Sequence, residues 1–149
     1  MKYLIQILTT IFFSVSMIFS QKTLIYAGSL IDGIAKKKRT NQTIVIENGI
    51  IVDVKDGFIE PKSKDKVINL KNTTVTPGWM DLHVHLGSQS SPQSYSEDFY
   101  LNPEDFAYRS VPWVEKTLLA GFTTVRDVGG EVVLAARDAV NKGYIKGPR

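Results

Sequence analysis

Short apolar runs alternate with turn residues between positions 23 and 76, a pattern typical of a small sheet built from strands. The clearest unit spans residues 43–54, where Asn48-Gly49 joins two apolar runs. Asn-Gly is a strong hairpin signal, because a type I′ turn needs φ > 0 at both central residues. Pairing outward from this turn sets Val45 against Val52 and Ile46 against Ile51. Apolar residues then lie on both faces, as expected for a sheet covered on each side.

Other apolar segments of this region predict further strands separated by turns. We expect a strand at Thr23–Ala27 that ends in a turn at Gly28-Ser29. A second apolar pair, Leu30-Ile31, precedes another turn, and Val67–Leu70 predicts another strand. No catalytic constellation occurs here, so we expect this region to have a structural role.

Residues 79–86 follow a Pro77-Gly78 turn and alternate between polar and apolar side chains. Because a strand has a period of two, one face would carry Asp81, His83 and His85. At about 3.3 Å per residue, the two histidine Cα atoms would lie roughly 7 Å apart. Two imidazoles so placed can turn toward one ion about 2.0–2.1 Å from each nitrogen, if that ion is zinc. The alternative is that both histidines lie on a solvated strand face.

The segment after this strand predicts a loop and then a helix. Residues 87–95 are rich in Ser, Gln and Pro, which is typical of a loop that either covers the end of the strand or is a plain solvated connection. Asn102-Pro103 is a good helix start, and Gly121 stands where a C-terminal cap belongs. We expect Pro112 to kink this helix or to split it in two.

A second strand and a second helix follow with short connections. Residues 122–127 predict a buried strand, and residues 131–142 predict a helix capped by Gly143. This βαβ order predicts a parallel sheet. Asp127 ends the second strand, at the face that carries catalysis in β/α barrels. Three roles stay open for Asp127: lining a pocket, pairing with Arg126, or capping the next helix.

The first twenty residues differ sharply from the rest. Lys2 is their only charge, and an apolar run with a few Ser and Thr leads to Ser20. This pattern predicts a signal peptide over residues 1–20, cleaved before Gln21, and a protein exported to the periplasm or the extracellular space. The competing interpretation is an uncleaved membrane anchor.

The amino-acid composition narrows the classes of protein to which this chain can belong. Hydrophobic content of 43% and charged content of 22% are those of a globular protein, and the formal net charge is only +3. The only basic run, Lys36-Lys37-Lys38-Arg39, lies between two predicted strands, which favours a solvated loop over a nucleic-acid patch. The chain has no cysteine, so it has neither a disulfide framework nor a thiolate site.

Three motifs resemble one known family. The stretch Pro77-Gly78-Trp79-Met80-Asp81-Leu82-His83-Val84-His85 is similar to the first barrel strand of the amidohydrolase superfamily, marked by Asp-x-His-x-His after Pro-Gly. Residues 120–130 and the closing Lys146-Gly147-Pro148-Arg149 also resemble its imidazolonepropionase-like and Xaa-Pro dipeptidase-like branch.

The resemblance implies an α/β fold: a small β-sandwich-like domain at residues 21–78, then the start of a (β/α)8 barrel at residues 79–149. It implies that His83 and His85 hold a divalent metal, zinc in the first instance, in a site of one or two ions, with Asp81 as a supporting residue. The family's other ligands are a carbamylated lysine, two later histidines and a late-strand aspartate that acts as the base. Because none of those positions exists here, the catalytic base stays unassigned, and we expect either the N-terminal part of a longer protein or a truncated gene product.

For the complete protein, the resemblance implies hydrolysis of an amide C–N bond by metal-activated water. Export favours a dipeptide or N-acyl amino acid as the substrate, with a cyclic amide as the alternative. A non-enzymatic scaffold with the same fold is the rival class. We expect a small-molecule partner and no nucleic acid, no membrane contact after signal cleavage, and no activity from this chain alone; the oligomeric state stays open.

Overall fold

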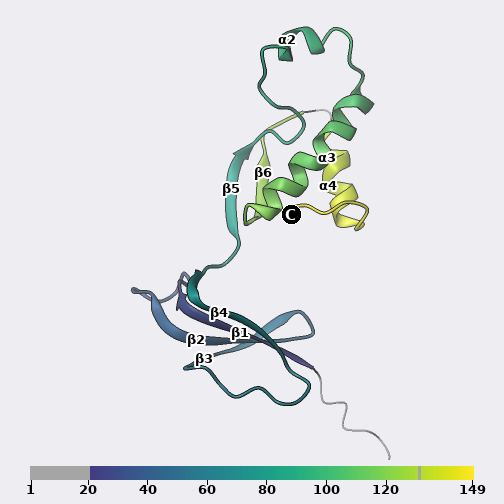
Figure 1. The fold of residues 1–149 in the computed structure, drawn as a ribbon. Helices are drawn as coiled ribbons and strands as arrows, with labels where there is room; N and C mark the ends of the chain where they lie inside the picture. Colours follow the sequence, from purple (N-terminus) through teal and green to yellow (C-terminus); the bar gives the residue numbers. More distant parts are fainter. Residues whose placement is uncertain (1–20, 131) are drawn as a thin grey trace, which may run out of the picture. The chain divides into compact units, whose positions relative to one another are not determined.

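The computed structural model describes residues 21–130 and 132–149 (Figure 1). The chain divides into two units, Met1–Val75 and Thr76–Arg149, which we describe separately. The predicted signal peptide at residues 1–20 lies outside the described residues. Across the two described ranges, no helix combines the length and the apolar character needed to cross a membrane.

The first unit is a four-stranded sheet with the strand order β3-β2-β1-β4. Its strands are β1 (Lys22–Leu30), β2 (Arg39–Glu47), β3 (Ile50–Asp56) and β4 (Lys66–Val75). β2 runs antiparallel to β1 and to β3, whereas β4 runs parallel to β1. The strand predicted at residues 67–70 is therefore confirmed as part of the longer β4.

The hairpin predicted at Asn48-Gly49 is confirmed, and the two residues have φ of 51° and 79°. Ile46 pairs with Ile51 as predicted, but Val45 pairs with Asp53, so the predicted pairing of Val45 with Val52 is wrong. The register shifts between Val45 and Ile46, which leaves one extra residue on β3. A β-bulge of this kind offsets every pair beyond it.

The turn predicted at Gly28-Ser29 is also wrong, because β1 continues through both residues. The pairing of β1 with β4 shifts register between Ala27 and Ser29. A Cβ atom on Gly28 would overlap the carbonyl oxygen of Lys71 and lie 2.6 Å from its carbonyl carbon. The glycine therefore allows a close approach of two backbones at a bulge, rather than a reversal of the chain.

Both faces of this sheet are buried at its centre, as predicted. One cluster contains Leu24, Tyr26 and Val45, and the other contains Ala27, Leu30 and Ile44. Phe58 and Ile59 pack on the first cluster, and the Tyr26 hydroxyl donates a hydrogen bond of 2.5 Å to the Ile59 carbonyl oxygen. The edge strand β3 is different, because it exposes three consecutive apolar side chains, Ile50, Ile51 and Val52.

Three residues of the basic run lie in a loop, as predicted, whereas Arg39 begins β2. Lys36, Lys37 and Lys38 are exposed between β1 and β2. The Asp32 carboxylate accepts hydrogen bonds of 2.9 Å from the Ile34 and Ala35 N–H groups. These two bonds, from Ala35 and then Ile34, hold the pKa of Asp32 below its usual value, and nearby Arg39 adds to the effect.

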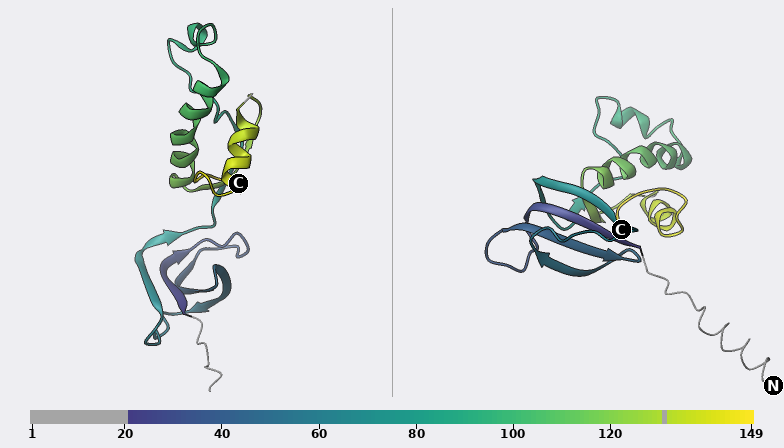
Figure 2. Two further views of the ribbon diagram at one scale, coloured as in Figure 1. Left: turned by 90° about the vertical axis from the view of Figure 1, so that its right-hand side faces the viewer. Right: turned by 60° about the horizontal axis from the view of Figure 1, so that its bottom comes forward.

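The second unit pairs two parallel strands with helices, which confirms the predicted βαβ order. Its elements are β5 (Trp79–Val84), α2 (Ser94–Glu97), α3 (Pro103–Leu119), β6 (Phe122–Asp127) and α4 (Val133–Asn141). α3 and α4 pack beside one another, as both views of Figure 2 show. The predicted loop at residues 87–95 is confirmed up to residue 93, and its last two residues begin the short helix α2.

The predicted boundaries of α3 are confirmed, with Asn102 as the N-cap residue and Gly121 at φ 99° after the helix. The Asn102 N–H donates a hydrogen bond of 2.9 Å to the Asp105 carboxylate. Of the two outcomes predicted at Pro112, a kink or a split, the split is wrong, because α3 is continuous through this residue. Proline removes one backbone donor there, while buried Val114 in the next turn keeps the helix packed. α4 begins at Val133, and Glu131, where the sequence predicts its start, lies outside the described residues.

The far edge of β6 also carries strand-like pairing. The Arg149 N–H donates to the Thr123 carbonyl oxygen at 2.9 Å, and the Arg149 carbonyl oxygen accepts from the Val125 N–H at 2.8 Å. In a parallel ladder, one residue forms hydrogen bonds with the residues directly before and after the residue that it faces on the neighbouring strand. Arg149 therefore occupies a strand position beside β6, on the side opposite to β5.

Candidate metal site at the end of two parallel strands

The structure brings His83 and His85 together at the carboxyl end of β5. His83 lies in the strand, and His85 follows its last residue, Val84. The two imidazole ring centroids are 5.5 Å apart, and the ring planes are inclined by 68°. Both side chains are exposed. The alternation that predicted a shared face therefore gives two neighbouring nitrogen donors that are open to a ligand.

This geometry is compatible with one shared metal ion. A tetrahedral zinc ion bonded about 2.0–2.1 Å from one nitrogen of each ring would place the ring centroids roughly 5 Å apart. The observed separation of 5.5 Å is close to that value. Among residues 21–130 and 132–149, no group of three or more His, Cys, Asp or Glu side chains comes together. The described residues therefore offer two nitrogen donors at this position.

Asp81 is engaged with the strand rather than with the two rings. Its carboxylate accepts a hydrogen bond of 3.0 Å from the His83 N–H. The same carboxylate does not join the imidazoles as a third clustered donor in the described part of the chain. This bond fixes the backbone of one candidate ligand.

Asp127 links the ends of the two strands. One carboxylate oxygen accepts a hydrogen bond of 2.7 Å from the Leu86 N–H, and the other accepts one of 3.0 Å from the Gly129 N–H. Within the described residues it neither pairs with Arg126 nor caps α4, whose N-cap residue is Val132. It is also one of the residues around a hollow of about 310 Å³ between β6, α3 and α4. Asp127 therefore fixes the backbone directly after His85.

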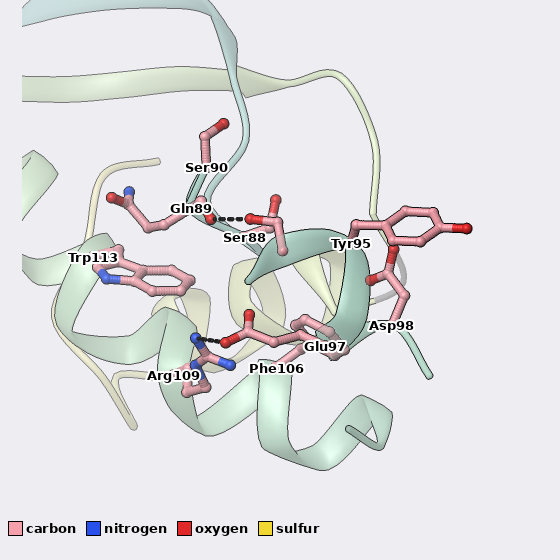
Figure 3. Close-up of a pocket in the computed structure, with 10 residues that line it drawn as sticks. Ser88, Gln89, Ser90, Tyr95, Glu97, Asp98, Phe106, Arg109 and Trp113 are labelled. Carbon is pink, nitrogen blue, oxygen red and sulfur yellow. Dashed lines mark hydrogen bonds and ion pairs between the residues drawn. The ribbon is translucent and has the colours of Figure 1, made fainter. Parts of the chain in front are cut away.

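A second feature of this unit was missed by the sequence reasoning. A cavity of about 230 Å³ lies between the segment after His85 and one face of α3 (Figure 3). Glu97 of α2 and Arg109 of α3 form an ion pair of 3.1 Å in its wall. Phe106, Arg109 and Trp113 recur at helical spacing, which would have identified the α3 side of the cavity. No sequence signal places α2 opposite that face.

Known proteins resemble this chain in sequence and in fold. Residues 74–149 match the sequence profile described as the amidohydrolase family. Among solved structures, the chain is similar to a Xaa-Pro dipeptidase with methionine bound in its active site, at 41% identity and a TM-score of 0.78; the match covers 87% of this chain and 32% of that one. A prolidase in complex with N-methylphosphonate-L-proline matches at 29% identity and a TM-score of 0.72, over 87% of this chain and 31% of that one.

A more distant similarity extends to an ochratoxinase. The ochratoxinase of A. niger matches at 28% identity and a TM-score of 0.65, over 87% of this chain and 30% of that one. No curated protein sequence matches the chain. The chain thus spans about a third of the length of the solved proteins that it resembles.

Proposed function

This chain belongs to the amidohydrolase family, and from that premise we propose that it supplies the first metal-binding strand of a hydrolase that cleaves amide C–N bonds. The observation that carries the proposal is the neighbouring His83–His85 pair at the end of β5. In the whole protein, β5 and β6 would be the first two strands of a (β/α)8 barrel. The parallel β5–β6 pair and the strand-like pairing of Arg149 beside β6 support that architecture.

The residues of this chain would hold the metal ion and orient its ligands. A bound divalent metal would lower the pKa of a coordinated water molecule toward 7 and would polarise the scissile carbonyl. His83 and His85 would bind it as neutral imidazoles, each through one ring nitrogen. Asp81 would hold the His83 backbone, and Asp127 would hold the backbone that follows His85. Outer-shell hydrogen bonds of this kind keep ligands in position and raise metal affinity.

The substrate that we propose is a dipeptide or an N-acyl amino acid, with a cyclic amide as the runner-up. The resemblance to a Xaa-Pro dipeptidase and to a prolidase supports the first choice. The assay needs a protein that includes the region corresponding to the rest of these relatives, loaded with zinc. We expect it to hydrolyse members of a panel of dipeptides and N-acyl amino acids. Turnover of small lactams alone would favour the runner-up, and turnover of no amide would favour a scaffold.

We also propose that the protein is exported and that its mature form begins at Gln21. The support is the short positive start and the apolar run that ends at Ser20. N-terminal sequencing of protein from a secreting host should find Gln21 or a close neighbour as the first residue. Recovery of soluble protein that still begins with Met1 would contradict cleavage.

A further inference from the structure

The turn between β2 and β3 contains a chemically reactive pair of residues. Of the six asparagines in the chain, Asn48 is the one that is followed by glycine. Asn48 and Gly49 are both exposed, and their φ angles are 51° and 79°. A Cβ atom on Gly49 would meet no atom beyond its chain neighbours within 4 Å, so the space around this backbone is open. The Gly49 amide nitrogen is therefore accessible to water and to the side chain before it.

The polar groups of this turn are not held by other parts of the described chain. There the Gly49 N–H donates no hydrogen bond, and the Asn48 side-chain amide forms none. Two Asp-Gly pairs of the same unit are held more firmly. The Gly57 N–H donates a hydrogen bond of 2.7 Å to the Asn41 carbonyl oxygen, and the Asp32 carboxylate accepts bonds from two N–H groups of its own loop. The Asn48 amide thus keeps the freedom to reach the next backbone nitrogen.

An asparagine in this setting can lose ammonia without an enzyme. The Gly49 nitrogen attacks the Asn48 side-chain carbonyl carbon, the new C–N bond closes a succinimide ring, and the bond from that carbon to the amino group breaks. The Gly49 proton leaves with the amino group as ammonia. Water then opens the ring at either carbonyl, which gives aspartate or isoaspartate. The reaction consumes only water, and it is fastest before glycine because no Cβ atom crowds the attacking nitrogen.

We propose that Asn48 is a site of spontaneous deamidation and that isoaspartate formed there loosens the β2–β3 hairpin. In isoaspartate the backbone runs through the side-chain carbonyl, which lengthens the turn by one methylene group. Turn type and length set the register of a hairpin, and this turn pairs Glu47 with Ile50. The extra atom opposes that pairing. The reaction needs neither a metal ion nor amide hydrolysis, so it is independent of the proposed function.

Asn41 provides a control within the same peptide. It is exposed and has the same φ of 51°, but it is followed by Gln42 instead of glycine. Trypsin releases both asparagines in one peptide, residues 40–55. After incubation of the 149-residue chain at mildly alkaline pH, fragmentation mass spectrometry measures the loss of each amide. We expect Asn48 to deamidate at least about tenfold faster than Asn41, and to give both aspartate and isoaspartate.

Two variants assign the reaction and its effect to the turn. Gly49→Asn keeps a residue that tolerates φ > 0 but adds a side chain at the attacking nitrogen, so it should slow the loss of the Asn48 amide about tenfold. Asn48→Gly also suits the turn, and it cannot react. On ageing, hydrogen–deuterium exchange over residues 40–55 should become faster in the unsubstituted chain and stay constant in Asn48→Gly. Equal deamidation at Asn48 and Asn41, an unchanged rate in Gly49→Asn, or equal exchange of the two aged chains would overturn the proposal.

Discussion

Replacing His83 or His85 by alanine is expected to remove most of the bound metal and nearly all amide hydrolysis from the complete enzyme. Each substitution deletes one of the two adjacent nitrogen donors at the end of β5. Without a properly held metal the attacking water loses its activation, so we expect a fall in kcat/KM of about 10³-fold or more, which corresponds to roughly 4 kcal/mol in the barrier. Metal content by atomic emission and a dipeptide assay measure the two losses.

The control for these variants is the residue directly before His83. Leu82→Ala shortens a side chain that alternates to the other face of β5, so it should leave the metal stoichiometry unchanged. The thermal unfolding midpoint of each variant separates ligand loss from misfolding. Full stoichiometry in both histidine variants would show that the pair is not a ligand pair.

Asp127→Ala is expected to destabilise the second unit by about 2–3 kcal/mol and to loosen the backbone around His85. Its carboxylate accepts hydrogen bonds from Leu86 and Gly129, which lie on the connections after β5 and after β6. A hydrogen bond to a charged group contributes about 1.5–3 kcal/mol, less where water competes for it. Urea unfolding of the 149-residue chain, followed by Trp79 and Trp113 fluorescence, gives the free energy of unfolding.

Two further variants make this prediction specific. Asp127→Asn keeps one amide oxygen as an acceptor and should lose about half as much stability. Asp138→Ala removes an exposed aspartate on α4 that forms an ion pair with its neighbour Arg137, so it should change the free energy of unfolding by less than about 0.5 kcal/mol. Equal stability of Asp127→Ala and Asp138→Ala would contradict the role assigned to the Asp127 bonds.

Local chemistry explains what the sequence could predict. The Asn48-Gly49 hairpin, the Asn102-Pro103 helix start and the alternation through His83 and His85 each depend on residues within one turn or one short strand. Backbone preference and side-chain period decide such features almost alone. They were sufficient to identify the parallel β5–β6 pair and the candidate ligands.

The features that could not be predicted depend on distant partners. From the sequence alone, Gly28 predicts a turn, whereas in the structure it allows the Lys71 carbonyl to approach closely. The hairpin sequence likewise contains no residue that predicts the β-bulge opposite Val45. Asp127 bonds to Leu86, which is 41 residues away. Glu97 meets Arg109, which lies 12 residues later, in the wall of the cavity. Each of these contacts is set by tertiary packing, so neither spacing nor residue type reveals it.

The most direct test of the histidine pair is a zinc titration of the 149-residue chain followed by ¹H NMR of its imidazole protons. The chain contains only two histidines, so every imidazole signal reports on His83 or His85. At pH 7.5 we expect zinc to shift the signals of both rings together. The shifts should weaken as the pH is lowered, because protonated imidazole cannot coordinate. Zinc that moves only one ring, or neither, at pH 7.5 would contradict a shared metal site.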